Sequence, residues 1–261
     1  KDLAEAQRTL GDQAGEIATL EKGLSLDPSD SGFRDQLLVA YEQGARWDKL
    51  AELISSNAEQ ATSNDQKIAL YRQAAKVHSD KRSDAAMAAA VLAKATEVNP
   101  NDRELMLELC DAYTRSGRAE ESVRVLEQIV ESFGGRRHKD LVDVHRRLAA
   151  AYHSSGRSEQ AVTELDKAFR IEPGNMNVLK DLGLLAIEIG DLKKAQQMFR
   201  ALLLQKFEGN TPITKAEVFY YLAEVHDRLG EKDKALSQAE RAVQTDPNLS
   251  KARDLVQRLK G

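Results

Sequence analysis

The stretch that decides the fold runs from Leu141 to Pro173 and reads LVDVHRRLAAAYHSSGRSEQAVTELDKAFRIEP. Each half of the stretch places apolar or small residues at the spacing of one helical face, first Leu148, Ala149 and Tyr152, then Ala161, Leu165 and Ala168. Gly156 lies between the two halves, where a tight turn favours a residue that accepts a positive φ. The stretch therefore predicts two short amphipathic helices that are joined by a turn and closed by Pro173.

Variants of this unit recur along the whole chain, and Gly183 follows Ala149 at the same place in the next unit. Short insertions at 136–140 and 207–211 interrupt the period. The expected units are an incomplete one at about 1–28, then 29–63, 64–100, 101–135, 141–173, 174–208 and 212–247, with a capping helix at 248–261. The incomplete first unit predicts that further sequence precedes Lys1. The last helix has a polar outer face, so it is expected to cover the end of a stack of repeats.

The unit resembles a tetratricopeptide repeat, whose pattern is W-x2-L-G-x2-Y, then A-x3-F, then P. Leu148-Ala149-x-x-Tyr152 matches the first part of the pattern, and Ala161-x3-Leu165 with Pro173 matches the rest. The resemblance implies an all-α fold, a right-handed superhelical α-solenoid of stacked antiparallel helix pairs. Pentatricopeptide repeats have a similar length and read RNA, but the Asp-Pro closures and the negative charge disfavour them. HEAT and armadillo repeats have longer periods.

The composition is that of a folded helical chain. Of 261 residues, 41% are hydrophobic, 31% are charged and only 5% are aromatic, and the net charge is −4. This balance gives no support for general nucleic-acid or membrane binding, and no apolar run is long enough to span a bilayer. A single cysteine excludes an internal disulfide framework and favours a reducing compartment. We therefore expect a cytoplasmic protein, although a chain that starts at Lys1 would not reveal a signal peptide.

No catalytic motif is present in the sequence. H-E-x-x-H, G-x-S-x-G, phosphate-binding loops and dinucleotide-binding glycine patterns are all missing, so we predict no enzyme activity and no cofactor. His145 and His153 share a helix but do not lie on one face, and neither has a Cys or His at metal-ligand spacing. No metal site is predicted. Cys110 falls in the small-residue slot that Ala149 fills, where a buried packing role is favoured over a reactive thiol.

The resemblance implies that the first helix of each pair lines a concave groove. We expect a protein or peptide partner to contact the side chains there that point away from the core, namely Asp143, Arg146, His153, Asn177, Lys180, Leu184, Ile187, Glu188, Tyr220 and Glu224. Leu184 and Ile187 are apolar in slots that should be solvated, and Tyr220 lies in the following unit. These three predict an apolar anchor for a peptide or helix. Packing within the stack, or against the 207–211 insertion, is the open alternative.

Basic residues gather near the first insertion. Arg136, Arg137, Lys139 and Arg147 form a patch that could hold an acidic partner segment or phosphate, and a solvated basic loop is the open alternative. The tail-binding clamp of some tetratricopeptide proteins, built from Lys, Asn and Arg on three units, is reproduced in neither of two registers that differ by one unit. The expected function is a non-catalytic protein–protein interaction scaffold. The alternatives are an RNA- or phosphate-binding module using residues 136–147, or the scaffold arm of a larger enzyme.

Overall fold

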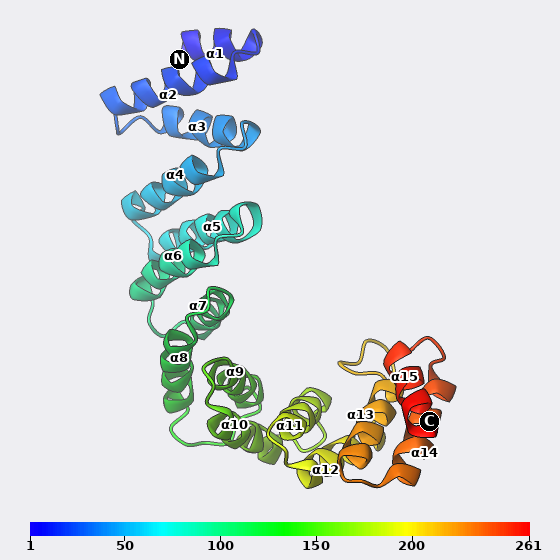
Figure 1. Ribbon diagram of the computed structural model, residues 1–261. Coiled ribbons are helices and arrows are strands. Elements are labelled where there is room, and N and C mark those ends of the chain that lie inside the picture. Colours follow the sequence, from blue (N-terminus) through cyan, green and yellow to red (C-terminus); the bar gives the residue numbers. More distant parts are fainter. The chain divides into compact units, whose positions relative to one another are not determined.

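A computed structural model describes residues 1–261 as fifteen α-helices without a strand. Figure 1 shows helices that follow one another in pairs joined by tight turns. This confirms the predicted all-α class of stacked helix pairs. Contacts divide the chain into two compact units, unit 1 with residues 1–125 and unit 2 with residues 126–261. The repeat pattern does not predict this division, and the scheme of individual repeat boundaries stays a prediction.

Unit 1 is a stack in which each helix packs mainly on its neighbours in the sequence. Its helices are α1 (Asp2–Thr9), α2 (Gln13–Leu26), α3 (Ser31–Gln43), α4 (Trp47–Gln60), α5 (Asn64–Arg82), α6 (Ala85–Val98) and α7 (Arg103–Arg115). Helix α8 (Ala119–Ser132) spans the division between the units. Helix α5 is the longest in the chain, with 19 residues.

Unit 2 repeats the arrangement. Its helices are α9 (Leu141–Ser154), α10 (Ser158–Ile171), α11 (Met176–Glu188), α12 (Leu192–Leu203), α13 (Lys215–Arg228), α14 (Lys232–Thr245) and α15 (Ser250–Lys260). Helices α9 and α11, the first members of successive pairs, also contact each other directly. The last helix, α15, packs on α14 and buries Ala252 and Leu255.

The turn within a pair has one recurring geometry. Gly156 has a φ of +75°, and the N–H of Arg157 after it donates to the carbonyl of Tyr152 at 2.8 Å. This bond satisfies a carbonyl that the end of the helix leaves without a partner. In the α3–α4 turn the non-glycine residue Ala45 takes the positive φ, at 50°, while the adjacent Gly44 stays at −83°. A glycine within a turn therefore does not by itself identify the residue that takes the positive φ.

Small residues set the distance between the helices. Ala149 and Ala161 are 2% and 0% exposed, as the close approach of two helices requires. A Cβ on Gly183 would lie 2.8 Å from Cζ of Phe199, so only glycine fits beneath that ring. The Tyr152 hydroxyl donates to Oε1 of Glu127 at 2.6 Å and ties α9 to the preceding helix α8. Burial and that carboxylate raise the pKa of Tyr152 to about 12.

Candidate functional site

Part of the predicted groove forms a pocket in unit 2 between α9 and α11. The pocket has a volume of about 220 Å³. Apolar side chains from α10 and α11 line it, and charged residues from α9 and α11 surround them; the lining residues are Arg146, Ala149, Ala150, His153, Leu165, Asp181, Leu184, Leu185 and Glu188. Leu184 is half-buried, whereas Leu165 belongs to the core. We call this site the α9–α11 pocket.

An ion pair and a histidine–carboxylate contact join the helices that form the α9–α11 pocket. Arg146 donates through Nε and Nη2 to Oδ2 of Asp181, at 2.9 and 2.8 Å. Nε2 of His153 lies 3.3 Å from Oε2 of Glu188. Oδ1 of Asp143 also lies 3.6 Å from Nη1 of Arg146. Most charged side chains of the groove therefore contact another charged side chain of the groove. The apolar surface of Leu184 has no such partner.

The prediction for Ile187 is wrong. Its side chain is only 7% exposed, so it packs inside the stack and does not face the groove. Its carbonyl accepts a hydrogen bond from Arg228 of α13 at 3.2 Å, which links successive pairs. Ile187 thus follows the alternative of packing within the stack, and of the three residues expected to form an apolar anchor only Leu184 lines the α9–α11 pocket.

Tyr220 and Glu224 line a different pocket, of about 410 Å³, between α13 and α15. Its charged residues form pairs: Arg228 with Glu224 at 2.7 Å, and Arg258 with Asp227 at 2.8 Å. Burial and the Glu224 carboxylate raise the pKa of Tyr220.

Two other predicted groove residues, Asn177 and Lys180, line neither of these pockets. They lie near the start of α11, where Lys180 approaches Asp181 at 3.7 Å. The ten predicted groove residues are thus not one site.

The residues of the predicted basic patch contact different partners within the chain. Arg147 donates to Oδ2 of Asp143 at 2.6 Å, and Lys139 lies 3.5 Å from Glu172. Arg137 donates to the backbone carbonyl of Arg170 at 2.9 Å. Arg136 is exposed in the loop between α8 and α9. This arrangement favours the solvated loop over a dedicated phosphate site, because the carboxylates already neutralise part of the charge.

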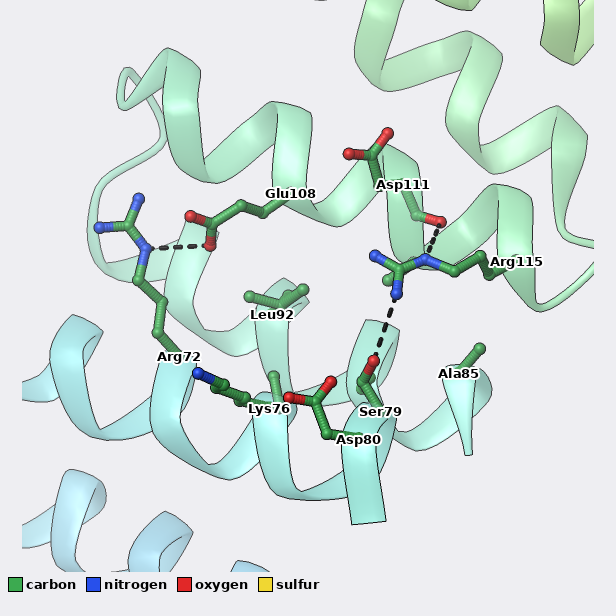
Figure 2. Close-up of a pocket in the computed structure, with 12 residues that line it drawn as sticks. Arg72, Lys76, Ser79, Asp80, Ala85, Leu92, Glu108, Asp111 and Arg115 are labelled. Carbon is green, nitrogen blue, oxygen red and sulfur yellow. Dashed lines mark hydrogen bonds and ion pairs between the residues drawn. The ribbon is translucent and has the colours of Figure 1, made fainter. Parts of the chain in front are cut away.

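The sequence did not predict a pocket in unit 1 between α5, α6 and α7. Its volume is about 340 Å³, and small and apolar residues line it beside a charged rim: Ala75, Ala85, Ala88, Leu92 and Ala112, with Arg72, Lys76, Ser79, Asp80, Glu108, Asp111 and Arg115. Figure 2 shows Arg72 and Arg115 at opposite ends. Nε of Arg72 donates to Glu108 at 2.9 Å, and Nη1 of Arg115 donates to Ser79 at 3.2 Å. We call this site the α5–α7 pocket.

A signal in the sequence could have found both pockets. The residues joined across successive first helices are 36 apart for Arg72 and Glu108, and 35 apart for Arg146 and Asp181. Pairs of opposite charge about one repeat apart therefore indicate helices at the same place in successive repeats that contact each other, although Lys94 and Glu59, 35 residues apart, join the second helices α6 and α4 in the same way.

Buried polar groups outside the pockets have structural roles. Nδ1 of His145 lies 2.7 Å from Oε2 of Glu164, and both residues are buried. Burial by itself would raise the pKa of Glu164, but hydrogen bonds from His145 and Lys167 hold it below its ordinary value. Cys110 is 1% exposed, in agreement with the packing role.

No group of three or more His, Cys, Asp or Glu residues is arranged to hold a metal ion. None of the helices is both long and apolar enough to cross a bilayer.

Several solved structures have a similar fold at low sequence identity. The C-terminal part of a tetratricopeptide repeat-containing protein from Cytophaga hutchinsonii aligns with a TM-score of 0.61 at 16% identity, over 97% of this chain and 98% of that one. MamA aligns with 0.57 at 17% identity, over 70% and 94%. YrrB, described as a tetratricopeptide repeat protein with an unusual peptide-binding site, aligns with 0.55 at 18% identity, over 78% and 97%.

Family models give the decisive comparison. No curated protein matches the sequence. Models of the tetratricopeptide repeat match residues 81–142, 143–175 and 216–249. These matches agree with the stacked helix pairs and support a scaffold that interacts with other proteins. The chain belongs to the tetratricopeptide repeat family.

Proposed function

We propose that this chain binds a peptide or short helix of a partner protein along the first helices of unit 2, with one apolar side chain of the partner in the α9–α11 pocket. A single observation carries the proposal. Leu184 forms an apolar opening in an otherwise charged surface, between the Arg146–Asp181 and His153–Glu188 contacts. An apolar pocket with a polar rim is typical of sites that anchor peptide side chains.

The size of the pocket supports a side chain as the occupant. Sites for drug-sized molecules usually have about 300–1,000 Å³. The α9–α11 pocket has about 220 Å³, which suits one side chain of a longer segment. The paired charges on its rim would hold α9 and α11 at a fixed separation, so little ordering is needed when the partner binds.

The partner is a protein rather than a nucleic acid in this proposal. The apolar pocket offers no favourable contact to the charged phosphates of a nucleic acid. Most residues of the basic patch already contact a carboxylate or a carbonyl. The proposal assigns binding and no reaction to these residues. If the chain is the scaffold arm of a larger enzyme, the α9–α11 pocket keeps the same proposed role.

A displayed random peptide library, selected on the full chain, tests the proposal. The dissociation constant of a selected peptide is then measured by fluorescence anisotropy with wild type, Leu184→Asp and Leu204→Asp. Leu204 is 85% exposed and lines none of the pockets described here, so its variant is a matched control. Leu184→Asp should weaken binding at least about tenfold, since a carboxylate loses hydration in an apolar contact. Equal affinity for all three proteins would contradict the proposal.

A further inference from the structure

The α5–α7 pocket is held open by contacts at both ends. Arg72 of α5 reaches across to Glu108 of α7, and Arg115 of α7 reaches back to Ser79 of α5. Nε of Arg115 also donates to the carbonyl of Asp111 at 3.3 Å, which fixes the side chain along its own helix. Figure 2 shows these two links with the space of the pocket between them. The pocket is therefore formed before any ligand arrives, and binding does not have to order it.

The floor of the pocket is apolar because the helices present small side chains there. Ala75, Ala88 and Ala112 are 4%, 3% and 4% exposed, and Leu92 is 7% exposed. Alanines on all three helices leave room that longer side chains would fill, which explains a volume of about 340 Å³. An apolar side chain of a ligand fits this floor, because it would remove apolar surface from water on both partners.

Two charged groups on the rim have no partner. Lys76 and Asp80 both line the pocket from α5, both are exposed, and neither forms an ion pair or hydrogen bond. Figure 2 shows them between Arg72 and Arg115. They are one helical turn apart, which corresponds to about 6 Å along the axis. Two residue steps of an extended peptide span about 7 Å. The spacing therefore suits one acidic and one basic residue with a single residue between them.

We propose that the α5–α7 pocket binds a peptide segment of a partner in which one apolar residue is flanked by an acidic and a basic residue. The apolar side chain occupies the alanine floor, the acidic residue faces Lys76 and the basic residue faces Asp80. A uniformly acidic ligand, such as nucleic acid, is disfavoured because Asp80, Glu108 and Asp111 share the rim with the three cations. The inference rests on the proposed function, since it assumes that the chain binds peptides, and it adds a second site with its own specificity.

The test uses the full chain carrying Leu184→Asp, so that the α9–α11 pocket does not contribute. The probes are two labelled peptides with blocked ends, Gly-Gly-Asp-Leu-Lys-Gly-Gly and Gly-Gly-Asp-Leu-Asp-Gly-Gly. They differ only in the charge of the residue that faces Asp80. The first should bind about five-fold more tightly than the second, the size expected when an exposed ion pair forms in one complex only.

A charge reversal then identifies the residue that selects the basic position. The variant Asp80→Lys changes only an exposed residue, so its helical circular dichroism should stay the same. It should prefer Gly-Gly-Asp-Leu-Asp-Gly-Gly. The control Asp233→Lys makes the same charge change at an exposed residue of unit 2 and should keep the original preference.

Three outcomes would overturn this inference: binding of neither peptide at millimolar concentration, equal binding of both, or a preference that Asp80→Lys leaves in place. None of them bears on the library selection with Leu184→Asp, so the proposed function is judged separately.

Discussion

The α5–α7 pocket of unit 1 and the α9–α11 pocket of unit 2 are built on the same plan and differ in two respects. In each, two polar contacts join successive first helices. The floor of the first pocket is mostly alanine, and its volume is about 340 Å³. The second is lined by Leu165, Leu184 and Leu185, and its volume is about 220 Å³. The size of the floor residues thus accounts for the different volumes of the two pockets.

The second difference is in the charges. Arg146, Asp181, His153 and Glu188 in unit 2 are all engaged across the pocket. Lys76 and Asp80 in unit 1 are not engaged. One repeat architecture therefore produces an apolar pocket without free charges in one unit and a pocket with two free charges in the other. The comparison teaches that the free charges at the rim of a pocket depend on which rim residues find a partner within the stack.

The largest expected effect comes from shortening the leucine that occupies the same place in both pockets. Leu92 and Leu165 are 7% and 3% exposed. Leu92→Ala and Leu165→Ala should each lower the free energy of unfolding by about 2–5 kcal/mol, because a cavity adds to the lost burial. Urea denaturation followed by circular dichroism measures this. A loss well below 1 kcal/mol in either variant would show that the leucine is not part of a packed floor.

A smaller loss is expected when a small residue between the helices is enlarged. Ala161 is 0% exposed, so Ala161→Leu should overpack the α9–α10 interface by about 1–3 kcal/mol. The control is Ala150→Leu, an exposed position that lines the α9–α11 pocket; it should change stability by less than about 0.5 kcal/mol. If Ala161→Leu were as stable as wild type in a thermal melt, the helix register of this pair would be wrong.

The two units should respond to acid in different pH ranges. Burial and the nearby Arg82 lower the pKa of His78 in unit 1 from its ordinary value of 6.5. Unfolded His78 then binds a proton more readily than folded His78, so stability is lost as the pH falls below 6.5. Glu164 in unit 2 has a pKa below 4.5, so its contribution is present above 4.5 and is lost as the pH falls through the lowered value.

Unfolding midpoints in urea at pH 7.5, 5.5 and 4 separate these contributions. His78→Gln should reduce the loss of stability between pH 7.5 and 5.5, and Glu164→Gln should reduce the loss below 4.5. If both variants kept the pH profile of the wild type, His78 and Glu164 would not be the cause of the different acid responses of the two units.

The smallest expected effect is that of the ion pair at the rim of the α9–α11 pocket. The side chains of Arg146 and Asp181 are 25% and 27% exposed, so solvent screens the pair. A double-mutant cycle with Arg146→Ala and Asp181→Ala should give a coupling of about 0.2–1 kcal/mol. A coupling above about 3 kcal/mol would mean that the pair supports the fold and not only the rim.

The helices and turns were predictable from the sequence because their signals are local. The periodicity around Leu148 and Ala161 and the glycine at 156 lie within one unit, and the structure has the corresponding helices α9 and α10. The site was less predictable. Whether Ile187 faces solvent depends on how the next pair packs, and whether Arg146 is available depends on Asp181, in the following repeat. A single repeat contains neither piece of information.

Hydrogen–deuterium exchange of the full chain, with and without a peptide selected from the library, tests the central claim most directly. Backbone amides of α9 (Leu141–Ser154) and α11 (Met176–Glu188) should exchange more slowly when the peptide is bound, while α12 and α14, which contribute no residue to the α9–α11 pocket, stay unchanged. Protection confined to the loop at 133–140, or to α10 and α12, would contradict the assignment of the partner to the first helices of unit 2.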